Sequence, residues 1–137
     1  MQVKFTISQL DNIPVLFVYS KNAAKDGKKA FAKLESKLSS IKRRKFYGVL
    51  EGTPENGIFR ACVEIMNTDK PKQLGLETWT IPGGKYVRGK IKNWWDNLHQ
   101  IKPTFNEMKK ECIYDSSKPT IEFYYRENIL YLYLPIK

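Results

Sequence analysis

The chain has 137 residues, of which 42% are hydrophobic and 28% charged, which indicates one folded domain spanning residues 1–137 and excludes a disordered chain. No stretch approaches the roughly 20 apolar residues of a membrane span, and the N-terminus lacks a signal peptide's apolar region, so we expect a cytoplasmic protein that does not contact membranes. The formal net charge of +10 is compatible with a nucleic-acid partner, although no zinc-finger, RRM or KH signature accompanies it.

The first half of the chain predicts two strands, a helix and two more strands. Alternating residues around Val3 and an apolar run at 13–19, with a turn between them, predict a β-hairpin. Two further strands are expected at 46–51 and 58–65. Apolar residues at helical spacing predict an amphipathic helix from about residue 24, with the stripe Phe31, Leu34, Leu38 and Ile41.

The second half repeats this order after a linker at 67–73. Strands at 76–81 and 85–90, on either side of Pro82-Gly83-Gly84, predict a second hairpin. Strands at 120–125 and 129–136, with a turn that includes Glu127, close the chain. A second helical stripe consists of Ile91, Trp95, Leu98 and Ile101, and Pro103 is expected to begin a further helical piece.

The repeated order predicts an α+β fold with two pseudo-twofold-related halves, 1–66 and 74–137, each strand-strand-helix-strand-strand. Antiparallel sheets would carry helices on one side, and a central ligand groove would lie between the halves. Neither half is expected to bury enough apolar surface to stand alone.

The densest basic run is Lys42-Arg43-Arg44-Lys45, which follows a lysine-rich helix. It is compatible with a patch that binds nucleic acid or an acidic protein. The same pattern is typical of the solvated face of a helix, and we favour that interpretation.

Histidine and cysteine are scarce. The single histidine, His99, argues against a multi-histidine metal site or a Ser-His-Asp triad, and we expect neither a metal nor an organic cofactor. Cys62 and Cys112 are far apart and form no CxxC motif. One disulfide is arithmetically possible, but two free thiols are the favoured interpretation for a reducing compartment.

Parity sorts the residues of the last two strands into faces, because side chains alternate across a strand. In 120–125, Glu122 and Tyr124 share a face. In 129–136 one face is aliphatic and the other carries tyrosines, among them Tyr133. We expect the aliphatic face to pack beneath helices and the tyrosine face to meet Glu122.

The first half supplies Tyr47 and Glu64 on the corresponding side, so the pseudo-twofold would gather five residues in one groove: Tyr47, Glu64, Glu122, Tyr124 and Tyr133. A carboxylate among aromatic rings costs several kcal/mol to desolvate unless it is hydrogen-bonded, paired or protonated, and tyrosine hydroxyls can donate the bonds. Such a groove suits a flat, hydrophobic, cationic ligand. The same residues fit equally well an open sheet face on which tyrosines and acids pair across strands.

Taken together, these segments resemble the GyrI-like small-molecule-binding family, which includes effector domains of multidrug-sensing transcription regulators. The matching segments, in order along the whole chain, are Phe46-Tyr47-Gly48, Ile81-Pro82-Gly83-Gly84-Lys85-Tyr86, Pro119-Thr120-Ile121-Glu122-Phe123-Tyr124 and Leu132-Tyr133-Leu134-Pro135-Ile136. The resemblance implies that Glu122 is the drug-binding carboxylate and that Tyr47 lines the same pocket. It also implies an aromatic lid on a helix, for which we choose Trp95 over its neighbour Trp94.

Three functions follow. The leading one is a binding module for planar, hydrophobic, often cationic compounds, for drug or toxin binding or protection, without the DNA-binding head of the regulators. The second is a hydrolase that opens the strained rings of cyclopropane-type DNA alkylators, with Glu64 and Glu122 as carboxylates that activate water and Tyr47 as a hydrogen-bond donor. The third is a basic protein that interacts with gyrase, nucleic acid or an acidic protein.

Overall fold

An eight-stranded antiparallel sheet organises the protein, described by a computed structural model that covers residues 5–20, 23–53, 56–126 and 128–137. The strands are β1 Thr6–Leu10, β2 Ile13–Ser20, β3 Phe46–Glu51, β4 Ile58–Glu64, β5 Glu77–Ile81, β6 Gly84–Lys92, β7 Thr120–Arg126 and β8 Ile129–Pro135. The helices are α1 Ala23–Ser36, α2 Pro71–Leu74 and α3 Ile101–Glu111, with the 3-10 turns η1 Trp94–Asp96 and η2 Leu98–Gln100. No helix in these ranges has the length and hydropathy needed to cross a bilayer.

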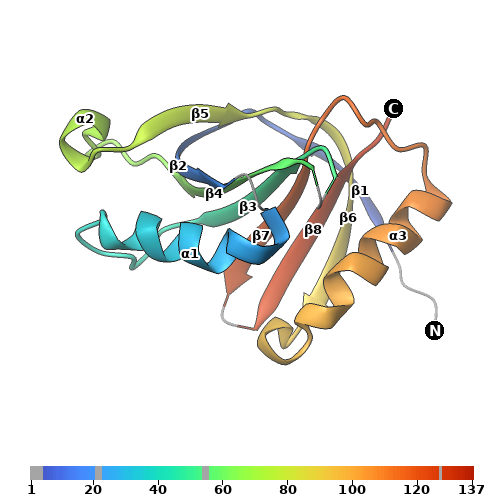
Figure 1. Ribbon diagram of the computed structural model, residues 1–137. Helices are drawn as coiled ribbons and strands as arrows, with labels where there is room; N and C mark the ends of the chain where they lie inside the picture. The colour runs from blue at the N-terminus through green and yellow to red at the C-terminus, as the bar shows by residue number, and fades with distance from the viewer. Residues whose placement is uncertain (1–4, 21–22, 54–55, 127) are drawn as a thin grey trace.

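The strands lie side by side in the order β1-β6-β8-β7-β3-β4-β2-β5. Each half of the chain contributes four strands, and the order reads the same from both edges when every strand is exchanged for its counterpart in the other half. The sheet curls, and α1 and α3 lie on the same side of it, over different halves (Figure 1). The predicted fold class is therefore confirmed. The division into 1–66 and 74–137 with a linker at 67–73 stays a prediction.

Two of the predicted hairpins are wrong, although their strands exist. β1 pairs with β6, where Ile7 lies opposite Val87, and β2 pairs with β4 and β5, where Val15 lies opposite Trp79. The short links β1–β2 and β5–β6 do not reverse the chain onto itself. Each link carries the chain from one end of the sheet to the other. The two links run antiparallel beside each other, between the pairs Leu10–Gly84 and Ile13–Ile81, and the Gly83 amide donates a hydrogen bond of 2.6 Å to Asn12 Oδ1. Val3, which we placed in the first strand, lies outside the described residues.

The hairpins β3–β4 and β7–β8 pair as the sequence indicated, while Glu127 of the second turn lies outside the described residues. The predicted helix from Ile91 is wrong: β6 continues to Lys92, and Asn93 then adopts a left-handed conformation (φ 52°) that ends the strand. α3 begins only at Ile101, with Pro103 in its first turn, where a missing amide does no harm.

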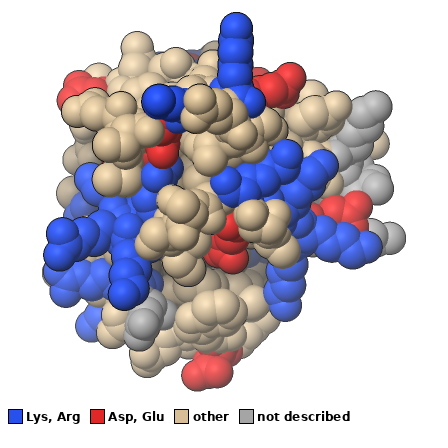
Figure 2. Space-filling model, turned by 90° about the vertical axis from the view of Figure 1, so that its left-hand side faces the viewer, with Lys and Arg blue, Asp and Glu red and all other residues tan. Residues whose placement is uncertain are grey.

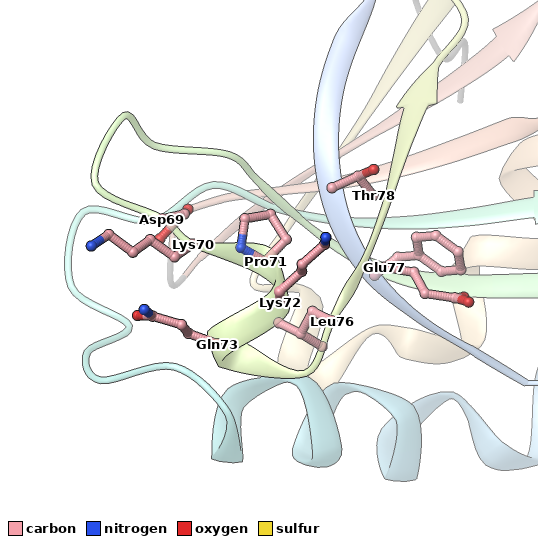
Figure 3. Close-up of a pocket in the computed structure, with 9 residues that line it drawn as sticks. Asp69, Lys70, Pro71, Lys72, Gln73, Leu76, Glu77 and Thr78 are labelled. Atoms are coloured by element: carbon pink, nitrogen blue, oxygen red, sulfur yellow. The ribbon is translucent and has the colours of Figure 1, made fainter.

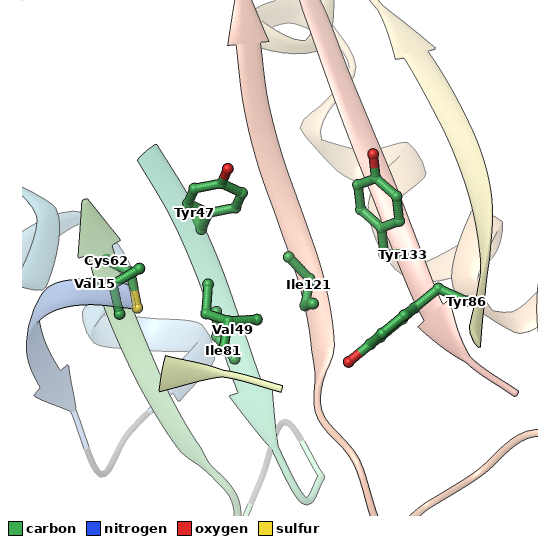
Figure 4. Packing of buried hydrophobic residues seen from close by; sticks show 8 residues of the cluster. All are labelled: Val15, Tyr47, Val49, Cys62, Ile81, Tyr86, Ile121 and Tyr133. Atoms are coloured by element: carbon green, nitrogen blue, oxygen red, sulfur yellow. The ribbon is translucent and has the colours of Figure 1, made fainter. Parts of the chain in front are cut away.

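The two faces of the sheet are packed differently. On the helix side, α1 buries Leu34 against Leu16, and α3 buries Met108 against Leu132, so each half has its own cluster. The other face holds one cluster that joins strands from both ends of the curled sheet: Val15, Tyr47, Val49, Cys62, Ile81, Tyr86, Ile121 and Tyr133 (Figure 4). Both cysteines are free thiols, and burial raises the pKa of Cys62.

Candidate functional site

A cleft of about 610 Å³ opens between α1 and α3, above the centre of the sheet. α1 and α3 form opposite walls, because each covers only its own half of the sheet. β3, β4 and β7 form the floor. The lining residues are Gly27, Lys28 and Phe31 from α1; Leu50, Gly52, Thr53 and Phe59 from β3 and β4 and the segment after β3; Leu98, Ile101, Lys102, Phe105, Asn106 and Lys109 from η2 and α3; and Tyr114, Ser116, Thr120, Glu122 and Tyr124.

Glu122 is the only carboxylate among the described residues that line this cleft. It lies on β7 opposite Gly48 of β3 and Leu132 of β8, and therefore faces the helix side of the sheet. The Tyr124 hydroxyl donates a hydrogen bond of 2.7 Å to Glu122 Oε1. Burial raises the pKa of the Glu122 carboxyl, and the bond from Tyr124 only partly opposes this. The cleft thus holds an acid that burial pushes towards its neutral form.

Aromatic rings surround this acid. Phe31 of α1 meets the ring of Tyr124 edge to face, with centroids 5.4 Å apart, and meets Phe59 at 6.0 Å. Gly48 makes room for them, since a Cβ there would lie 3.0 Å from the Phe59 ring and 3.4 Å from the Tyr124 hydroxyl. The arrangement offers flat apolar surfaces next to one polar group, as small-molecule sites usually do.

Three of the predicted groove residues do not join Glu122. Tyr47 lies opposite Phe123, Tyr133 lies opposite Ile121, and both side chains are on the face away from the helices. Glu64 is on that face too, 3.8 Å from Lys45. The expectation of a single groove was wrong because parity sorts residues within a strand, whereas the register between strands decides which faces coincide. The aliphatic face of β8 and the acid face of β7 are the same face.

The aromatic lid that we predicted, Trp95, is not part of the cleft lining. Trp95 is 65% exposed. Its ring stacks on Trp94 at 4.3 Å, and Trp94 in turn lies 5.1 Å from the Tyr124 ring and donates a hydrogen bond to the Arg126 carbonyl. Trp94 therefore supports the tyrosine that holds Glu122, and Trp95 forms the outer layer of this stack.

Sequence reasoning missed the wall that α3 provides. Leu98, Ile101, Phe105 and Lys109 recur at three- and four-residue spacing, which is the signature of one helical face. We read the first two of these as a stripe that packs on the sheet. Part of this helical face stays uncovered because α1 and α3 lie apart. No local sequence pattern predicts that separation.

A second depression, of about 960 Å³, lies beside α2 at one end of the sheet, lined by Phe17, Asp69, Lys70, Pro71, Lys72, Gln73, Leu76, Glu77 and Thr78 (Figure 3). It is larger but shallow. Of the two acids that line it, Asp69 is occupied by Arg44, with both oxygens within 2.9 Å of the guanidinium, and Glu77 is exposed to solvent. We therefore place the candidate site in the cleft between α1 and α3.

The predicted basic run does not form one free patch. Arg44 binds Asp69, and Lys45 lies beside Glu64. On the side of the molecule where α1 ends and α2 lies, Lys and Arg gather in several groups separated by uncharged and acidic side chains (Figure 2). This arrangement fits a solvated surface.

The stability of the protein should report the state of Glu122. Because burial raises its folded pKa above the unfolded value, wild type should lose stability as the pH rises from about 4.5 through the folded pKa. Glu122→Gln has no such group, so its free energy of unfolding should exceed that of wild type increasingly over this range. Urea unfolding of both proteins at several pH values measures the difference. If the free energies of unfolding of the two proteins change in parallel with pH, the raised pKa of Glu122 is contradicted.

No protein-family model matches the chain, and no curated protein matches its sequence. Several solved structures resemble it. An integron cassette protein from the mobile metagenome of Vibrio cholerae has 21% identity and a TM-score of 0.68 over 97% of this chain and 95% of that one. The EcmrR C-terminal domain has 12% identity and a TM-score of 0.71 over 100% and 99%. SAV2435 bound to tetraphenylphosphonium has 11% identity and a TM-score of 0.65 over 98% and 94%. The chain shares the fold of these proteins, which is consistent with a GyrI-like fold.

Proposed function

We propose that this protein binds planar hydrophobic small molecules, cationic ones among them, in the cleft between α1 and α3, as a drug- or toxin-binding module of the GyrI-like kind. The observation that carries the proposal is Glu122, an acid held in an apolar aromatic cleft and hydrogen-bonded by Tyr124. Desolvating an acid there costs stability, which a binding role explains and a purely structural role does not.

Two further observations support this function. The cleft volume of about 610 Å³ lies in the range of drug-sized ligand sites. A neighbour with the same fold, SAV2435, was solved with the lipophilic cation tetraphenylphosphonium bound. Glu122, Tyr124, Phe31 and Phe59 are the residues to which we assign ligand contacts. Tyr47, Glu64 and Tyr133 receive no role in this cleft.

The test compares wild type with Glu122→Gln, using the cationic dye rhodamine B ethyl ester and fluorescence polarisation. The substitution keeps the shape and removes the charge, so the affinity should fall by roughly 1–3 kcal/mol as a charge-assisted contact is lost. Affinity of wild type should also rise with pH, because the cation favours ionised Glu122. Glu64→Gln, on the opposite face, is the matched control and should bind like wild type. Equal affinities for wild type and Glu122→Gln would sink the assignment.

A second candidate is a hydrolase that opens strained cyclopropane rings in the same cleft. The raised pKa of Glu122 favours it, since burial makes the carboxylate a stronger base towards a proton of water. Incubating the protein with a cyclopropane-bearing alkylator and identifying the products separates the two functions. An enzyme should lose far more turnover than affinity in Glu122→Gln, whereas a binding protein should form no product.

A further inference from the structure

The charged residues that line the cleft are not balanced. Three lysines belong to its walls, Lys28 on α1 and Lys102 and Lys109 on α3, against the single carboxyl of Glu122. All three lysines are exposed, whereas Glu122 is partly buried on the floor. Among the described lining residues the lysines outnumber the acid, so the entrance is cationic whether or not Glu122 is ionised.

The positions of the lysines are set by the helices. Lys102 and Lys109 are seven residues apart, two turns of α3, and both belong to the face that also presents Phe105 to the cleft. The Lys109 amine lies 4.8 Å from the centre of the Tyr114 ring, a cation–π contact that places it at the lining. The adjacent Lys110 does not line the cleft, and its amine pairs with Glu107 at 3.2 Å. The cationic lining thus follows from helix geometry rather than from the high lysine content alone.

A ligand that carries only positive charge would pass these lysines at a cost, and a ligand with an acidic group would be attracted to them. We infer that the cleft selects amphipathic planar molecules that carry an acidic group, a carboxylate, sulfonate or phosphate, which lies against Lys28, Lys102 and Lys109 while the apolar body fills the aromatic floor. The inference rests on the proposed binding function and names the ligand class within it. A ligand of this class with a cationic or hydrogen-bond-donating end would satisfy Glu122 as well.

Rhodamine B and its ethyl ester test this directly, since they share the planar xanthene cation and differ in one carboxylate. Wild type should bind the free acid about threefold to tenfold more tightly than the ester at low ionic strength, as expected for several exposed charge contacts. Added salt should shrink this preference, because it screens exposed charges. In the triple variant Lys28→Gln, Lys102→Gln and Lys109→Gln the preference should vanish, and the ester should bind more tightly than to wild type, because the repulsion of its cation is removed as well.

The control is the double variant Lys29→Gln and Lys110→Gln, which removes neighbouring lysines of the same two helices that do not line the cleft and should keep the preference. Thermal melting checks that each variant is folded, and the salt series on wild type tests the inference without any variant. If both dyes bind wild type equally, or the ester binds better, the inference is overturned and the proposed function stands. A preference that survives in the triple variant overturns the lysine assignment. If neither dye binds, the proposed function itself fails.

Discussion

Replacing Asp69 with alanine is expected to lower the free energy of unfolding by about 3–5 kcal/mol, the usual cost of removing one partner of a buried ion pair. Arg44 and Asp69 form two hydrogen bonds, of 2.8 and 2.9 Å, and their side chains are only 7% and 8% exposed. Asp69 also accepts a bond of 2.8 Å from the Met66 amide. The pair holds the segment between α1 and β3 against the segment between β4 and α2. Urea denaturation measures the loss.

The matched control is Glu107→Ala, which breaks the exposed pair with Lys110 and should change stability by less than about 0.5 kcal/mol. The hydrogen bonds from Arg44 hold the pKa of Asp69 below its usual range. The contribution of Asp69 is therefore complete above about pH 4, where the unfolded chain is ionised, and is lost as the pH falls through the folded pKa. Wild type and Asp69→Ala should converge in acid, and a constant gap would argue against the ion pair.

Gly83→Ala is expected to destabilise the fold by about 3 kcal/mol or more, the upper range for overpacking. A Cβ at Gly83 would lie 2.6 Å from the Leu10 carbonyl oxygen and 2.8 Å from the Asn12 amide nitrogen, both of which are backbone atoms that cannot turn aside. The β1–β2 and β5–β6 links would have to separate, and the hydrogen bond between Gly83 and Asn12 would be lost.

Gly27→Ala serves as the comparison for Gly83→Ala. Gly27 lies in α1, and a Cβ there would touch only the ring of Phe59 at 3.6 Å, an ordinary contact. Alanine should stabilise the helix at that position by about 1 kcal/mol. Thermal melts should therefore move in opposite directions for the two variants. A melting temperature of Gly83→Ala equal to that of wild type would show that the β1–β2 and β5–β6 links are not tightly packed against each other.

The sequence predicted every strand and α1, because each has a clear local signal, either a period or an apolar run, and it predicted that Glu122 and Tyr124 share a face. It did not predict the pairs β1–β6 and β2–β5, which join residues such as Ile7 and Val87 from opposite halves. Two-residue links between apolar strands usually mark hairpins. Here each link instead carries the chain from one end of the sheet to the other. Only the curl of the whole sheet, which brings those ends together, distinguishes this arrangement from a hairpin.

Only part of the candidate site could be predicted, again because local patterns do not encode long-range geometry. Glu122 stood out as an acid in an apolar strand, which is a local signal. Phe31 and Phe105, which line the cleft with it, lie on two helices whose separation is a property of the assembled fold. Tyr47 and Tyr133, which we also grouped with Glu122, belong to a separate cluster, in which burial and then Glu64 raise the pKa of Tyr47. That cluster is on the other face of the sheet, and register between strands, which no single strand encodes, separates the two.

The β1–β2 and β5–β6 links also affect how the chain folds during translation. During synthesis the first half leaves the ribosome before its sheet can be completed, because β1 pairs with β6 and the outer edge of β2 awaits β5. Unpaired strand edges are prone to join other chains, and pairings of long sequence separation form slowly. The open edge of β3 then waits for β7, and the open edge of β6 waits for β8, which is the last strand of the sequence. The nascent protein is thus exposed to intermolecular pairing until nearly all of this sequence has emerged, and its dependence on chaperones should last equally long.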